Sequence, residues 1–189
     1  NEIVEDLGVK VNPAIDLIAV DNEIIPVDTQ DAPVYLLFNK PCGYLTSHKS
    51  QFGTPTIFEL PALHKHKSML KYAGRLDKET SGLLVLTTDG NLIQKITHPS
   101  HEMTKTYRVG LKQKLSPQSM RALKNGFNGL EDGPVRFLQV SKIHLSSEDL
   151  YGYDVKVQEG RNRLIRRIFS SLGHRVTTLQ RIQLGPIKI

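Results

Sequence analysis

Residues 74–90 read GRLDKETSGLLVLTTDG, and this stretch decides the expected fold. Its polar start carries one carboxylate, Asp77, with a cation on either side. Residues 80–82 (Thr-Ser-Gly) predict a turn, because glycine adopts the backbone angles that a sharp reversal needs. The apolar run 83–86 then predicts a short buried strand. A carboxylate at the mouth of a buried strand is a candidate chemical site, although spacing alone favours a simpler interpretation, a helix cap or a loop ion pair.

Charge is distributed unevenly along the 189 residues, whose formal net charge is +6. Residues 1–31 hold eight acidic side chains and one basic side chain, whereas the remaining 158 residues hold 24 basic and 11 acidic side chains. A body this basic indicates a polyanionic partner, most simply nucleic acid. We place a domain boundary at 31/32, where the composition changes, and expect domains at 1–31 and 32–189.

Composition also excludes several classes of protein. No apolar run approaches the roughly 18 residues that a membrane helix needs, so we expect no membrane contact. The single cysteine, Cys42, excludes an intramolecular disulfide framework and fits a reducing, cytoplasmic location. The seven histidines and this cysteine show no metal-ligand spacing, and we expect neither a metal nor a redox cofactor.

The central stretch resembles the signature of the pseudouridine synthases, in particular the ribosomal-RNA group typified by RsuA. That motif runs G-R-L-D, two variable residues, then T-[ST]-G-L-L-L-L-T-N-D-G. Here it departs only at Val85 and Thr88. So many ordered positions are far more specific than a lone glycine pattern. The resemblance covers about residues 34–189 and places the family's catalytic aspartate on Asp77.

Two weaker elements flank this motif. Residues 39–44 (NKPCGY) resemble the family's N-K-P-x-G element, which makes Lys40 a candidate substrate-binding residue, with a solvated turn lysine as the alternative. Residues 105–107 resemble the K-x-Y segment, whose tyrosine lies in the active site, so the resemblance makes Tyr107 a catalytic candidate. Without the family, Tyr107 would be an ordinary half-buried strand tyrosine.

The second specific motif is 159–174, EGRNRLIRRIFSSLGH. Its apolar residues recur at helical spacing, and Gly173 stands where a helix C-cap glycine belongs. In the family match, Arg166 pairs with the catalytic aspartate and Ile165 lines the base pocket; Leu164 replaces a glutamine that many relatives carry. A guanidinium beside a carboxylate favours its charged form. The alternative is an amphipathic helix with a solvated basic face. We expect phosphate contacts from the remaining arginines of the two specific motifs, Arg75, Arg161, Arg163 and Arg167.

The resemblance implies an α+β fold, with a central, mostly antiparallel mixed sheet flanked by helices and an active cleft across its middle. Residues 1–31 are similar to the closing strands of an S4-type RNA-binding module, with a hairpin turn at Asp21-Asn22, and we expect the chain to be a piece of a longer protein. Residues 46–72 form a basic irregular stretch, either an RNA contact or an ordinary surface loop. The remaining pattern predicts strands at 34–38, 105–109, 135–143, 150–158 and 176–184, and helices at 91–96, 117–125 and 164–172.

The implied activity is the isomerisation of uridine to pseudouridine in ribosomal RNA by a monomer. The target uridine must leave its stack to reach a buried carboxylate. The Arg-Asn-Arg sequence at 161–163 favours the 23S RNA of the large subunit. Three alternatives remain open: a 16S target, a catalytically silent RNA-binding or ribosome-assembly factor, and a carboxylate hydrolase that uses Glu79 as its second carboxylate.

Overall fold

The structure is a computed structural model, and it describes residues 3–4, 9, 11–12, 15–25, 32–147 and 149–189. The chain divides into two compact units, Asn1–Pro33 and Val34–Ile189. In the first unit, strands β1 (Ala19–Val20) and β2 (Glu23–Ile24) form a short antiparallel hairpin. Its turn lies at Asp21-Asn22, as predicted, and both residues adopt a positive φ. Of residues 1–31, which resemble the closing strands of an S4-type module, residues 1–2, 5–8, 10, 13–14 and 26–31 fall outside the described part.

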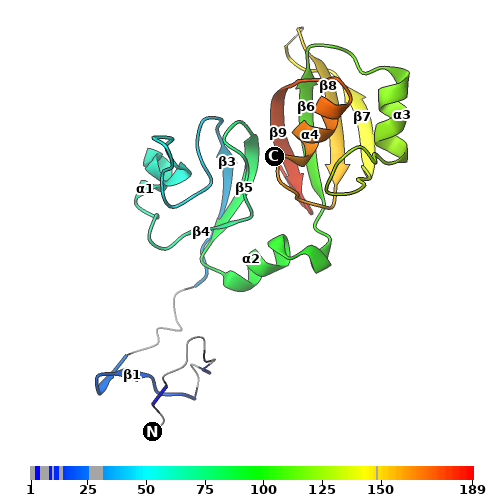
Figure 1. The fold of residues 1–189 in the computed structure, drawn as a ribbon. Coiled ribbons are helices and arrows are strands. Elements are labelled where there is room, and N and C mark those ends of the chain that lie inside the picture. The colour runs from blue at the N-terminus through cyan, green and yellow to red at the C-terminus, as the bar shows by residue number, and fades with distance from the viewer. Residues whose placement is uncertain (1–2, 5–8, 10, 13–14, 26–31, 148) are drawn as a thin grey trace. The chain divides into compact units, whose positions relative to one another are not determined.

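The second unit is built on one mixed sheet. Its described strands are β3 (Tyr35–Lys40), β4 (Lys71–Ala73), β5 (Ser81–Thr87), β6 (Lys105–Leu111), β7 (Gln139–Ile143), β8 (Tyr151–Val157), β9 (Val176–Leu184) and the short β10 (Ile187–Lys188), which pairs with β9. They follow the order β3-β5-β9-β6-β8-β7, and β4 pairs with β5 (Figure 1). The first sheet half consists of β3, β4 and β5, and the second sheet half consists of β9, β6, β8 and β7. The pairings between these strands are antiparallel except that of β5 with β9.

Helices begin and end where the local sequence signals predict. Asp89 caps α2 (Gly90–Thr97) by accepting from the amides of Asn91 and Leu92. Ser116 caps α3 (Pro117–Asn125), whose first residue is proline. After α4 (Leu164–Ser171), Gly173 takes a φ of +79° and its amide donates to the Ser170 carbonyl, the expected C-terminal motif. The described part also holds α1 (Pro61–His64) and two 3₁₀ turns, Ile57–Glu59 and Pro99–His101.

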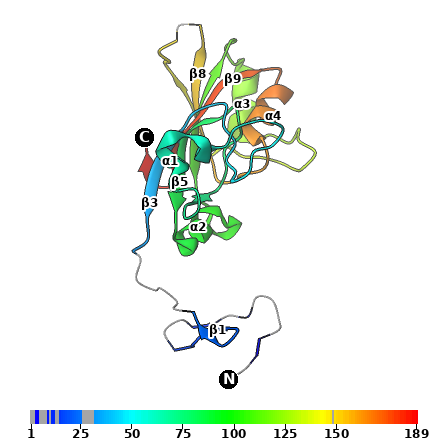
Figure 2. The same ribbon diagram turned by 90° about the vertical axis from the view of Figure 1, so that its left-hand side faces the viewer.

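The buried apolar residues form three clusters, one of which joins β5 to Leu184 of β9. Helices α3 and α4 lie beside the second sheet half, against β7 and β9, whereas α2 packs against β4 and β5 (Figures 1 and 2). The largest cluster joins α4, through Ile168 and Phe169, to the buried residues of β6 and β8. Two smaller clusters cover β5: one receives Ile57 and Phe58 from the 3₁₀ turn, and the other receives Ile96 from α2. This α+β architecture agrees with the expected fold, and it leaves the strand pair β5–β9 at the seam between the halves.

Three local predictions were wrong. Residues 46–72, which were expected to be irregular, hold the 3₁₀ turn Ile57–Glu59, helix α1 and the start of β4, and Ile57 and Phe58 are buried. The reversal expected at 80–82 lies at 78–79 instead, and Gly82 stands inside β5 with a φ of +105°. A Cβ on Gly82 would lie 2.3 Å from the Arg181 carbonyl oxygen, so this glycine permits the close approach of β5 and β9 rather than a turn. The strand expected at 135–143 begins only at Gln139; residue 135 instead pairs with Phe127 in an isolated bridge.

Candidate active site

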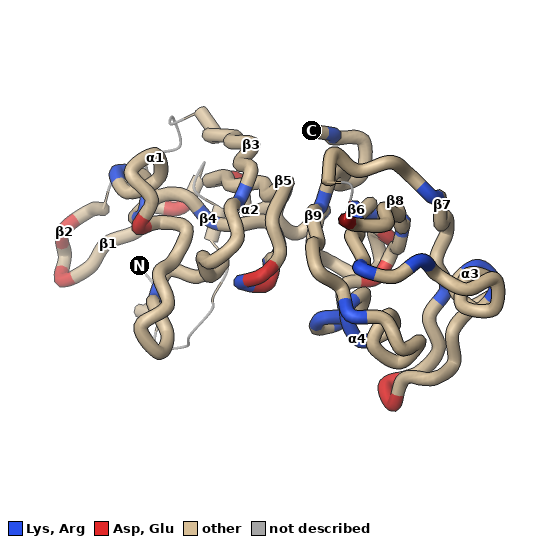
Figure 3. Tube along the Cα trace, turned by 90° about the horizontal axis from the view of Figure 1, so that it is seen from above, with Lys and Arg blue, Asp and Glu red and all other residues tan. Residues whose placement is uncertain are grey.

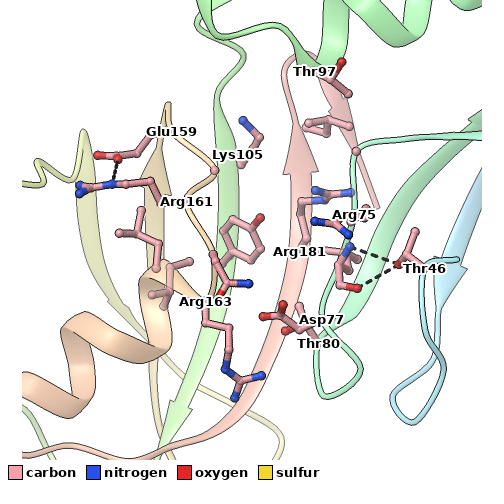
Figure 4. Close-up of a pocket in the computed structure, with 18 of the residues that line it drawn as sticks. Thr46, Arg75, Asp77, Thr80, Thr97, Lys105, Glu159, Arg161, Arg163 and Arg181 are labelled. Carbon is pink, nitrogen blue, oxygen red and sulfur yellow. Dashed lines mark hydrogen bonds and ion pairs between the residues drawn. The ribbon is translucent and has the colours of Figure 1, made fainter. Parts of the chain in front are cut away.

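A cavity of about 1090 Å³ opens at the seam between the sheet halves (Figure 4). The loop before β5 contributes Asp77, β6 contributes Tyr107, and the start of α4 contributes Ile165. Three candidate residues that are far apart in the sequence therefore line one cavity. Arg75, Arg161 and Arg163 line it too, whereas Lys40, Arg166 and Arg167 do not belong to its wall.

The loop that carries Asp77 is fixed from both sides. The Thr46 hydroxyl donates to the Leu76 carbonyl oxygen at 3.0 Å and accepts from the Leu76 amide at 3.2 Å. The amide of Thr80 donates to the Asp77 carbonyl oxygen at 3.0 Å, which closes the turn. Asp77 is half-buried at the cavity wall, and these hydrogen bonds fix the backbone that carries its carboxylate.

Lys40 lies beneath this loop and is fully buried. Its Nζ donates to the carbonyl oxygens of Pro41, Asp77 and Thr80 at 2.9–3.1 Å and lies 3.5 Å from that of Lys78. Burial lowers the pKa of Lys40 from 10.5 to about 8. Lys40 is therefore not a solvated turn lysine, because its donors hold the main chain around Asp77.

Arg166 connects α4 to the Asp77 loop through main-chain contacts. Its guanidinium donates to the Glu79 carbonyl oxygen at 2.9 Å and to the Val176 carbonyl oxygen at 3.3 Å. Burial lowers the pKa of Arg166, while the negative charges of Glu79 and Asp77 act in the opposite direction. Asp77 and Arg166 are thus electrostatic neighbours, and their direct pairing stays a prediction.

Glu79 is occupied by an ion pair. Its Oε2 accepts from Nη1 of Arg163 at 2.8 Å, and this hydrogen bond lowers the pKa of the Glu79 carboxyl. A hydrolytic acid partner would need the opposite shift, toward a carboxyl that stays protonated at neutral pH. Glu79 is therefore a poor second carboxylate for a hydrolase.

Arg161 and Arg167 meet at the loop between α3 and β7. Arg161 pairs with Glu159 and Asp132 and also donates to the carbonyl oxygens of Gly133 and Pro134. Arg167 pairs with Asp132 at 2.7 Å. Figure 3 shows the basic positions of this region along α4. Of the arginines expected to contact phosphate, Arg75 is exposed at the cavity and Arg163 shares its charge with one carboxylate.

The sequence profile of the family described as RNA pseudouridylate synthase matches residues 34–171. This chain belongs to that family. It is 36% identical over 189 residues to an uncharacterized RNA pseudouridine synthase of Aquifex aeolicus, covering all of this chain and 73% of that protein.

Two further pseudouridine synthases show the same relationship. Ribosomal large subunit pseudouridine synthase B of Pseudomonas aeruginosa is 36% identical over 190 residues, covering 99% of this chain but only 48% of that enzyme. A solved crystal structure of a pseudouridylate synthase superposes with a TM-score of 0.70 and 29% identity, covering 99% of this chain and 76% of that one. The pseudouridine synthase fold and the family expected from the central motif are thereby confirmed.

Sequence reasoning missed one charged residue of this pseudouridine synthase. Arg181 on β9 lines the cavity, yet only 2% of its surface is exposed. Its Nε donates to the Leu83 carbonyl oxygen at 2.7 Å, while its Nη2 is buried without a hydrogen-bond partner. The strand pattern alone gave no signal, because an arginine in an alternating strand predicts a solvent-facing side chain.

Within the described residues of this pseudouridine synthase, no helix has the length and apolarity to cross a membrane. In the same part of the chain, no three His, Cys, Asp or Glu side chains gather as a metal ion would require.

Proposed function

We propose that this pseudouridine synthase converts a specific uridine of ribosomal RNA, and that its target is the 23S RNA of the large subunit. Three observations support this proposal: the relatives named for the large subunit, the basic body of the chain, and the cavity at the seam. The observation that carries it is the convergence of Asp77, Tyr107 and Ile165 on one cavity from three separate segments.

Asp77 is the proposed nucleophile. Because isomerisation consumes nothing, the reaction needs a positioned, ionised carboxylate rather than a redox partner. Arg166, held between α4 and the Asp77 loop, places a positive charge near this carboxylate. Lys40 is assigned an organising role beneath the loop, in place of the direct substrate contact expected from the sequence, because its ammonium contacts only main-chain oxygens there.

Tyr107 and Ile165 form the proposed site of the base. Extrusion of a uridine from its stack costs a few kcal/mol. Stacking on an aromatic ring recovers about 1–3 kcal/mol, which gives Tyr107 its role. Ile165, 5% exposed at the start of α4, supplies an apolar wall, and neighbouring Leu164 belongs to the same core.

The backbone of the flipped nucleotide stays at the mouth of the cavity. Arg75 and Arg163 are the proposed phosphate contacts, since both line the cavity and remain accessible. Arg161 and Arg167 also remain candidates for phosphate contacts. Both form ion pairs with Asp132 in the neighbouring loop, so RNA phosphates would have to compete with that carboxylate.

The rest of the chain receives proposals that follow from this activity. We assign residues 1–31 to an S4-like remnant and residues 32–189 to the catalytic domain. We further propose a cytoplasmic location, where ribosomal RNA is found, and a monomer, since described residues of one chain line the seam cavity from several elements.

The deciding experiment is release of tritium from transcripts labelled at C5 of uridine. Wild type and Asp77→Asn are compared on 23S and 16S RNA under identical conditions. Release from 23S RNA by wild type alone is the expected result. Release from 16S RNA only would reassign the subunit, and RNA binding without release from either would support a silent RNA-binding protein.

A further inference from the structure

An uncompensated positive charge lies at the wall of the seam cavity. Arg181 is 2% exposed, and among the described residues no carboxylate forms an ion pair with it. A buried charge is costly unless hydrogen bonds or an opposite charge offset that cost. Here one nitrogen bonds the Leu83 carbonyl oxygen, and Nη2 has no partner.

The surroundings of Arg181 place it at the proposed base site. In the β6–β9 ladder, Arg181 lies directly opposite Tyr107, and paired residues of neighbouring strands project to the same face. Figure 4 shows Lys105, Arg181 and Asp77 around the same hollow, from β6, β9 and the loop before β5. Lys105, which is half-buried, adds a second cation there, and both burial and the charge of Arg181 lower the pKa of Lys105.

The depth of Arg181 distinguishes between two possible ligands. Phosphate groups of a flipped nucleotide remain joined to the RNA chain outside the cavity, where the accessible Arg75 and Arg163 lie. The base alone enters fully. A guanidinium that is almost completely buried beside Tyr107 therefore faces the base.

We propose that Arg181 is a further catalytic residue, which donates a hydrogen bond to a carbonyl oxygen of the uracil and stabilises the negative charge that forms on it. This inference rests on the proposed function. When the C1′–N1 bond breaks, its electron pair stays on N1 and is shared with the two carbonyl oxygens, O2 and O4. If Asp77 instead adds to C6, the displaced electron pair of the C5–C6 double bond reaches O4. The charge therefore appears on the base in either route, and a fixed donor there acts in the transition state.

The test uses single-turnover tritium release with Arg181→Gln, Arg181→Lys and the control Arg121→Gln on the exposed side of α3. Removal of one such donor lowers a rate about 100–1000-fold, and we expect this loss for Arg181→Gln with an unchanged Kd for RNA. Arg181→Lys keeps the charge and loses about 10-fold. Loss of reaction amplitude at an unchanged rate constant would reveal a purely structural role and overturn the proposal. Weaker RNA binding by Arg181→Gln, with a smaller dependence of Kd on salt concentration and an unchanged rate constant, would mark a phosphate contact and would also overturn the proposal.

A second measurement does not depend on the folding of any variant. Once the converted uridine is mapped, wild type is assayed on RNA that carries 2-thiouridine or 4-thiouridine at that position, since sulfur accepts a hydrogen bond poorly. One of the two substitutions should slow wild type at least 10-fold and have little further effect on Arg181→Gln. Full wild-type rates on both RNAs would overturn the contact. If wild type releases no tritium from any ribosomal RNA, the proposed function itself has failed, a result distinct from activity that survives in Arg181→Gln.

Discussion

Replacement of Gly82 by alanine should separate the two sheet halves. The added Cβ would lie 2.3 Å from the carbonyl oxygen and 2.7 Å from the amide nitrogen of Arg181, and both are backbone atoms that no rotamer change can move. The φ of +105° is unfavourable for alanine, which costs about 1–3 kcal/mol, and overpacking costs a further 1–3 kcal/mol or so. We therefore expect Gly82→Ala to lower the free energy of unfolding by about 2–6 kcal/mol.

The assay is urea unfolding beside single-turnover tritium release. Gly90→Ala is the matched control, because nothing lies within 4 Å of a Cβ there and alanine favours the first turn of α2. The control should be neutral or stabilised by up to about 1 kcal/mol. If Gly82→Ala unfolds within about 1 kcal/mol of wild type and retains its rate, the close approach of β5 and β9 does not constrain this site.

Two further changes test other parts of the fold. Lys40→Met should lower the free energy of unfolding by about 2–4 kcal/mol at pH 7, since hydrogen bonds from a charged donor contribute about 1.5–3 kcal/mol each and the relieved burial of charge offsets part of the loss. The pKa of Lys40 is about 8 in the folded protein and 10.5 in the unfolded chain, so the unfolded chain binds more protons between these pH values and the free energy of unfolding of wild type rises with pH there. Lys40→Met lacks this group, so the difference in free energy of unfolding between wild type and the variant should widen as pH rises through that window. A constant difference in urea titrations would contradict this. Ser116→Ala should cost about 1 kcal/mol through loss of the α3 cap, measured against Ser146→Ala on an exposed loop.

Features fixed by neighbouring residues were predictable from the sequence. The helices expected at 91–96, 117–125 and 164–172 lie within one residue of their observed bounds, because their caps, Asp89, Ser116 and Gly173, depend on contacts within four residues. The family motif likewise located Asp77, Tyr107 and the α4 motif, which the structure brings to one region.

Features that depend on distant partners were not predictable. Gly82 looked like a turn residue because its constraint comes from β9, almost 100 residues later. Burial of Lys40 depends on the loop at 77–80, and burial of Arg181 depends on the carbonyl of Leu83. The alternation of apolar and polar residues along a strand assigns each residue to one face of the strand. It does not reveal that this face lines a cavity inside the same protein.

The order of the chain has a consequence for its biosynthesis. Strand β9 is made after β5 and β6, the two long strands that it pairs with, and only the two-residue β10 joins it later. The strand pairing of β5 with β9 is short, with Ser81 opposite Gln180 and Gly82 opposite Arg181. The nascent chain can therefore form β3–β4–β5 and β6–β7–β8 as separate antiparallel modules while residues 176–184 are still inside the ribosome. Asp77 then belongs to one module and Tyr107 to the other. The enzyme cannot act on RNA before its last long strand has emerged.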